Sequence, residues 1–176
     1  MKAMPNRTEF TSSGHLPETP LGTLRLEITS QGLARITFCA AAEAVDCVDA
    51  GNSTFATAPL LLAAMEQLRD YFDGRRQSFS VPLDWQGISP FQERVLRATL
   101  DIPYGQTRTY GELAADLGQP GASRAVGVAL GKNPLPIVIP CHRVLGNQGR
   151  LQGYSAPDGL TKKTWLLKLE GVLLIG

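Results

Sequence analysis

The chain has 176 residues, of which 43% are hydrophobic, so it can form one domain or two small ones that fold without a partner. No apolar run approaches the roughly 20 residues of a membrane-spanning helix, and the first residues lack the apolar core of a signal peptide. The formal net charge of +1 is unevenly divided, because residues 1–84 carry 7 Lys/Arg against 10 Asp/Glu and residues 85–176 carry 10 against 6.

The first half of the chain predicts a small α+β domain over residues 1–84. Residues 22–39 predict a β-hairpin of an antiparallel sheet, because apolar residues alternate on both sides of a polar turn. From Ala58 the apolar spacing lengthens to that of a helix, which Gly74 should end. Residues 79–81 suggest one more strand.

The second half, residues 85–176, predicts a mainly helical domain. Helices are expected from Pro90 onward and at residues 110–117, 122–130 and 160–170. Thr109 and Glu112 have the spacing of a capping box at the start of one of them.

The two short helices on either side of residues 119–121 form a candidate helix-turn-helix, although such a pair can also be simple packing. The second helix consists mostly of small residues, and Gly127 within it costs about 1 kcal/mol relative to Ala. A neighbouring helix or a nucleic-acid groove could compensate by close approach. Arg124 favours the groove, because helix N-termini also attract anions. The basic residues of segment 124–168 fit a DNA backbone or a merely soluble surface.

Cys141 is the candidate nucleophile. A lone cysteine is more often a buried, inert residue, but His142 follows it directly and a proline-rich segment precedes it. A thiol reacts as the thiolate, which His142 and Arg143 could favour. Adjacent side chains do not face each other in an extended strand, so a bent backbone or a water relay is required. Glu170 could orient the imidazole or be an ordinary surface residue.

The remaining cysteines do not predict a metal site or disulfides. Cys39 and Cys47 have seven residues between them, and the chain contains no Cys-x-x-Cys pair. Three cysteines are an odd number, which fits a reducing compartment. The cysteine usage therefore predicts a cytoplasmic protein without structural zinc. We also expect it to be a monomer with no cofactor and no association with membranes.

The second half resembles the O6-alkylguanine-DNA alkyltransferases over residues 85–172. The resemblance depends on eight short motifs in chain order: Ile-Pro-Tyr-Gly at 102–105, Tyr-Gly-Glu-Leu-Ala at 110–114, Arg-Ala-Val-Gly at 124–127, Asn-Pro at 133–134, Pro-Cys-His-Arg-Val at 140–144, Gly-Tyr at 153–154, Trp-Leu-Leu at 165–167 and Glu-Gly at 170–171. The first domain resembles the family only in its size and α+β character. The resemblance implies a DNA repair protein that moves an alkyl group from guanine O6, and less readily from thymine O4, onto its own cysteine.

The resemblance also implies a role for each matching residue. Cys141 would accept the alkyl group, His142 would act as a base through water, Glu170 would hold the imidazole, and Asn133 would brace the loop. Tyr110 would help to rotate the target nucleotide and protonate guanine. Arg124 would fill the gap in the duplex, while the helix that contains Ala125 and Gly127, followed by Lys132, would lie in the minor groove. Val144, Tyr154 and Ser155 would line the guanine pocket.

Residues 155–160 are about two residues longer than the family's pattern, which makes the lip of the pocket a point of difference. Two other functions remain open. A cysteine hydrolase would use Cys141, His142 and Glu170 for many turnovers. A damage-recognition module would bind lesions without repairing them, although the presence of Cys141 argues against it.

Overall fold

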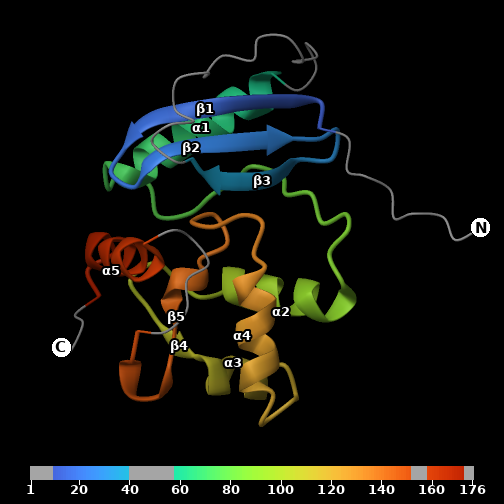
Figure 1. The fold of residues 1–176 in the computed structure, drawn as a ribbon, viewed down its shortest axis with the longest axis vertical. Coiled ribbons are helices and arrows are strands. Elements are labelled where there is room, and N and C mark those ends of the chain that lie inside the picture. The colour runs from blue at the N-terminus through green and yellow to red at the C-terminus, as the bar shows by residue number, and fades with distance from the viewer. Residues whose placement is uncertain (1–9, 40–57, 152–157, 173–176) are drawn as a thin grey trace, which may run out of the picture. The chain divides into compact units, whose positions relative to one another are not determined.

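The computed structural model describes residues 10–39, 58–151 and 158–172, and the chain divides into two units, Met1–Ser89 and Pro90–Gly176 (Figure 1). The sequence predicts the domain boundary after residue 84, and the structure divides the chain between Ser89 and Pro90. The α+β class is confirmed, with the sheet in the first unit and most of the helices in the second. No helix among the described residues is long and apolar enough to cross a membrane.

The first unit contains an antiparallel sheet whose strands follow the order β1 (Ser12–Thr19), β2 (Gly22–Ile28) and β3 (Leu33–Phe38). The predicted hairpin is confirmed as β2 and β3, with Leu26 opposite Ile36. Strand β1 was not predicted from the sequence. Its segment contains Pro17 and several small polar residues, so the alternation that identifies a strand is weak.

Helix α1 (Ala58–Phe72) covers one face of this sheet (Figure 1). The packing is close, because a Cβ built on Gly14 of β1 would lie 2.7 Å from Met65 Cε. Gly74 follows the helix with a φ of +71°, in the left-handed region where glycine is unstrained, as expected for a helix stop.

The strand predicted at residues 79–81 is wrong. The neighbouring segment instead makes one isolated bridge between Leu33 and Leu83, through Leu33 N–H to Pro82 O at 2.8 Å and Asp84 N–H to Leu33 O at 2.9 Å. Pro82 has no N–H to donate to a ladder, so the pairing does not extend.

The second unit contains helices α2 (Pro90–Leu100), α3 (Tyr110–Asp116), α4 (Ser123–Gly131) and α5 (Gly159–Leu169), which confirms the predicted helices to within a few residues. The capping box is also confirmed: Thr109 Oγ1 accepts from the Glu112 N–H at 3.1 Å, and Glu112 Oε2 accepts from the Thr109 N–H at 2.7 Å. Gly118 ends the first helix of the pair with a φ of +70°.

A short parallel pair of strands, β4 (Arg108–Thr109) and β5 (Val144–Leu145), was not predicted. It pairs Arg108 with Val144 and Thr109 with Leu145. The residue that caps α3 is thereby joined to the segment just after Cys141. This pairing brings the helix-turn-helix and the cysteine loop together.

Candidate active site

Cys141 begins a single turn of 3-10 helix, η1 (Cys141–Arg143), at the end of a constrained loop. Asn133 holds that loop from inside. Its Oδ1 accepts from the Leu135 N–H at 2.9 Å, and its Nδ2 donates to Ile139 O at 3.0 Å and to Cys141 Sγ at 3.2 Å. Ile137 has a φ of +76°, which is strained for a β-branched residue and is tolerated only where the surroundings enforce it.

The 3-10 turn determines how the adjacent nucleophile and base are oriented. With three residues per turn, the side chains of Cys141 and His142 leave the backbone about 120° apart and do not face each other. His142 points instead to Glu170, with 2.8 Å between Nε2 and Oε1. Any proton transfer between thiol and imidazole therefore has to use the other ring nitrogen, Nδ1, and a bridging water.

Glu170 is buried and accepts from several donors at once. Besides His142, Arg143 donates to both carboxylate oxygens, from Nε to Oε2 at 2.8 Å and from Nη2 to Oε1 at 2.9 Å. The side chains of His142 and Glu170 are fully buried, and that of Arg143 is 7% exposed. Burial lowers the pKa of His142 below its ordinary value, against the opposing effects of Glu170, so the imidazole is neutral near pH 7.

The turn at residues 102–105 covers this carboxylate. Arg143 Nη1 donates to Ile102 O at 2.6 Å, and the Gly105 N–H donates to Glu170 Oε2 at 3.3 Å. Gly105 has a φ of +74°, and a Cβ there would lie 3.0 Å from the Glu170 carbonyl oxygen. A larger residue would be both strained and crowded, so this motif of the family resemblance also encloses Glu170.

Lys163 is a site residue that sequence reasoning missed. Its side chain is fully buried, its Nζ donates to Val144 O at 2.6 Å, and the same nitrogen lies 5.9 Å from the centroid of the Tyr110 ring. Burial lowers the pKa of Lys163 to about 8, and the nearby Cys141 opposes that shift. Helical spacing could have revealed it, because positions 163, 166, 167 and 170 form one buried stripe of α5 and its C-cap.

The electrostatics of Cys141 differ from the expectation. The residue is 8% exposed, and burial raises the pKa of its thiol above the ordinary value. The opposing effects come mainly from the Asn133 hydrogen bond and the charge of Lys163. The expectation that His142 and Arg143 would favour the thiolate is therefore wrong for Arg143, which is committed to Glu170, and the cation that acts on the sulfur is Lys163.

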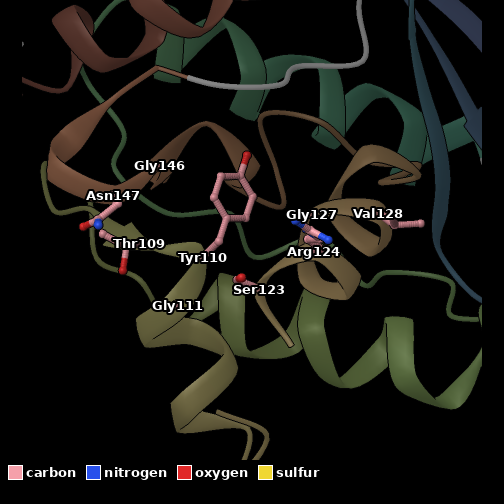
Figure 2. Close-up of a pocket in the computed structure, with 9 residues that line it drawn as sticks. All are labelled: Thr109, Tyr110, Gly111, Ser123, Arg124, Gly127, Val128, Gly146 and Asn147. Atoms are coloured by element: carbon pink, nitrogen blue, oxygen red, sulfur yellow. The ribbon is translucent and has the colours of Figure 1, made fainter. Parts of the chain in front are cut away.

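A cavity of about 940 Å³ opens between α3, α4 and the segment that follows β5 (Figure 2). It is lined by Thr109, Tyr110, Gly111, Ser123, Arg124, Gly127, Val128, Gly146 and Asn147. The half-buried Tyr110 connects the cavity to the sulfur. Burial raises the pKa of Tyr110, and Cys141 adds to this effect, so the phenol keeps its proton at neutral pH.

Packing of α4 against its neighbours does not require a glycine at position 127. A Cβ there would lie 3.8 Å from the Tyr110 ring, which is an ordinary contact distance. Arg124 and Ala125 are exposed on the same helix, and Lys132 is exposed just after it. Close packing of helices therefore does not explain Gly127, and Arg124 and Ala125 belong to the exposed surface of α4.

The remaining predicted pocket residues are only partly placed. Val144 is fully buried and is not part of the cavity lining, while its carbonyl accepts from Lys163. Tyr154, Ser155 and Cys47 lie outside the described residues. Among the described residues, no group of three or more His, Cys, Asp or Glu side chains could hold a metal ion.

Comparison with known proteins identifies the same two units. Residues 14–85 match the ribonuclease-like domain of 6-O-methylguanine DNA methyltransferase, and residues 90–172 match its DNA-binding domain. The chain is 43% identical over 154 residues to the methylated-DNA–protein-cysteine methyltransferase of Methanosarcina acetivorans, covering 88% of this chain and 95% of that protein. A constitutive enzyme of the same name from Bacillus subtilis is 41% identical, over 88% and 93% of the two chains.

A solved structure extends the likeness to three dimensions. The crystal structure of Mycobacterium tuberculosis OGT in complex with DNA is 39% identical, with a TM-score of 0.74 over 90% of this chain and 91% of that one. The identity and the coverage of both units are more than a shared fold would require. The chain therefore belongs to the family of methylated-DNA–protein-cysteine methyltransferases.

Proposed function

We propose that the chain is a methylated-DNA–protein-cysteine S-methyltransferase that repairs O6-alkylguanine, and less readily O4-alkylthymine, by moving the alkyl group to Cys141. The observation that carries the proposal is the sulfur of Cys141, which accepts a hydrogen bond from Asn133 and affects the pKa values of Lys163 and Tyr110, while Tyr110 also lines a cavity between the helices of a helix-turn-helix. Double-stranded DNA with alkylated bases is the partner. The protein works as a monomer in the cytoplasm.

The transfer needs no cofactor. The thiol of Cys141 loses its proton through water to the neutral His142, which Glu170 holds in place. The thiolate attacks the alkyl carbon, so a sulfur–carbon bond forms while the bond from that carbon to guanine O6 breaks. The electron pair of the broken bond stays with the base, which takes a proton from Tyr110. That proton is replaced from the imidazolium through solvent, and the products are unmodified guanine and an S-alkylcysteine.

The reaction is a single turnover for each chain. A thioether has no leaving group that water or a base could displace under mild conditions, and Cys141 is the only cysteine among the described residues of the second unit. This separates the proposed reaction from a cysteine hydrolase, whose thioester intermediate is hydrolysed. The alkylated chain therefore cannot react a second time.

The position of the sulfur supports a mechanism in which the target nucleotide is flipped out of the duplex. Cys141 is almost completely buried, and an alkyl carbon within a base stack cannot reach it. Extrusion of a nucleotide costs a few kcal/mol, which an inserted side chain can offset. Arg124, exposed on α4 at the rim of the cavity, would take the place of the flipped base (Figure 2). Binding through the minor groove suits repair in any sequence, because that groove carries little base information.

We expect Arg124→Ala to slow repair of a duplex lesion by about tenfold or more while leaving the reaction with free O6-benzylguanine unchanged. The reason is that a free base needs no extrusion, whereas loss of an inserted side chain removes a kcal/mol or more of compensation. Single-turnover rates on both substrates measure the effect. Arg97→Ala removes an equal charge from α2 and should change neither rate. Equal losses on both substrates would exclude an insertion role.

We expect Lys163→Met to raise the pKa of the Cys141 thiol further, because the variant lacks the cation that lowers it. The fraction of thiolate at neutral pH should fall by about tenfold for each unit of that rise. Alkylation of Cys141 by iodoacetamide across the pH range measures it. In the unsubstituted chain the rate should climb through the neutral range, and the help from Lys163 should fade above its pKa of about 8.

The control for this variant is Lys162→Met, which removes a neighbouring, less buried cation. Its pH profile should match that of the unsubstituted chain. Overlapping profiles for Lys163→Met and the unsubstituted chain would show that Lys163 has no influence on the thiol.

Incubation with a duplex that contains O6-methylguanine, followed by the intact mass, separates the candidate functions. Alkyl transfer adds one methyl group per chain. A hydrolase leaves the mass unchanged with continued turnover, and a damage-recognition module leaves the mass and the lesion unchanged while binding. The last two results would each overturn the proposal.

A further inference from the structure

Val128 is an exposed apolar side chain in the middle of the DNA-facing helix. It is 60% exposed, although the other large apolar residues of α4, Val126 and Leu130, are buried. It also lines the cavity together with Arg124. Exposure of a β-branched side chain on a helix contributes neither packing nor helix propensity, so the fold itself does not explain Val128.

The position of Val128 relates it to two cations. Arg124, Val128 and Lys132 follow one another at intervals of four residues, which places them along one side of α4 with about 6 Å of axial rise between neighbours. All three are exposed, and α4 itself contains no acidic residue. Val128 is therefore an exposed apolar side chain between two positively charged side chains, Arg124 and Lys132.

Figure 2 shows Tyr110 on one side of Arg124 and Val128 on the other. A nucleotide that rotates toward Tyr110 leaves the duplex on the side of Arg124 away from Val128. Val128 would then face the base pair that remains stacked next to the vacated position.

We propose that Val128 contacts the minor-groove edge of this neighbouring base pair and makes repair more efficient when the pair is A·T than when it is G·C; this inference rests on the proposed function. Proteins that bind the minor groove often press apolar side chains against or between base steps. In that groove a G·C pair adds the N2 amino group of guanine, whereas an A·T pair does not. An apolar methyl group cannot accept a hydrogen bond from that amino group, and it is also crowded by it.

A protein partner fits this surface less well. Stable protein interfaces bury more than about 1,000 Å² around clusters of apolar residues, whereas Val128 stands alone among small residues and cations. The exposed Lys132 instead complements the phosphates that border a groove.

The test compares Val128→Ala with the unsubstituted chain on two duplexes in which the base pair beside O6-methylguanine is A·T or G·C. Alanine keeps the helix and removes the contact. Single-turnover transfer on the A·T duplex should slow by about five- to tenfold, on the scale of burying a valine side chain. The loss on the G·C duplex should be smaller, so the preference for A·T should shrink. Inosine in place of the guanine of the G·C pair lacks the amino group, so the unsubstituted chain should then react as fast as it does on the A·T duplex.

Leu62→Ala is the matched control, because Leu62 is 65% exposed on a helix of the first unit, and it should change neither rate. Reaction with free O6-benzylguanine should also be the same for Leu62→Ala and the unsubstituted chain. An unchanged rate for Val128→Ala, or a loss of equal size on both duplexes, would overturn the inference. Failure of the proposed function is a different result, since the unsubstituted chain would then transfer no alkyl group at all.

Discussion

Cys141→Ser should abolish alkyl transfer and leave binding to duplex DNA nearly unchanged. A serine hydroxyl occupies the same place but is far harder to ionise, and neither Asn133 nor Lys163 can make it a comparable nucleophile. Binding should survive because the exposed side chains of α4 and Lys132 lie outside the η1 turn that holds the sulfur. Transfer is measured as methyl groups gained per chain, and binding is measured by fluorescence anisotropy at a fixed salt concentration.

Cys39→Ser serves as the control for this substitution. Cys39 is a partly exposed thiol of the first unit, and its loss should affect neither measurement. A Cys141→Ser chain that folds but no longer binds DNA would show that the cysteine has a structural part in the interface. Residual transfer in that variant would point to another acceptor.

Glu170→Gln should reduce the free energy of unfolding of the second unit by about 3–5 kcal/mol. Glutamine keeps the shape of the side chain, but it removes the negative charge that compensates the buried Arg143 and holds His142. A buried cation without its counter-ion is among the most destabilising changes known for a folded chain. Urea unfolding followed by tryptophan fluorescence measures the loss.

A matched control is Glu93→Gln, which breaks the exposed pair between Glu93 and Arg97 on α2. That change should cost no more than about 0.5 kcal/mol, because solvent already screens the pair. Folded Glu170→Gln protein should also transfer the alkyl group more slowly, because His142 loses the partner that orients it. Comparable stability losses for the two variants would contradict the buried network as the source of the effect.

Local signals in the sequence were sufficient for the helices. The capping box at Thr109 and the apolar spacing of α1 each depend on residues within a few positions of one another, and both are confirmed. The proximity of His142 and Glu170 is a longer-range feature. It was inferred from the family resemblance and is present in the structure at 2.8 Å.

The features that the sequence did not predict depend on contacts between distant segments. The two-residue strands β4 and β5 are too short to show any alternation, and only their pairing defines them. Lys163 was counted as part of a basic surface, because a lysine is rarely buried and its partners, Val144 and Tyr110, lie far away in the chain. Lys163 is buried on the stripe of α5 that ends at Glu170, and its charge there lowers the pKa of the Cys141 thiol.

Peptide mapping after reaction with a duplex that contains O6-([¹³C]methyl)guanine tests the central claim most directly. We expect one labelled methyl group per chain, located on the peptide that contains Cys141, together with an equal amount of unmodified guanine in the DNA. A lesion that is erased while Cys141 remains unlabelled, or a label on Cys39 or Cys47 instead, would contradict the account.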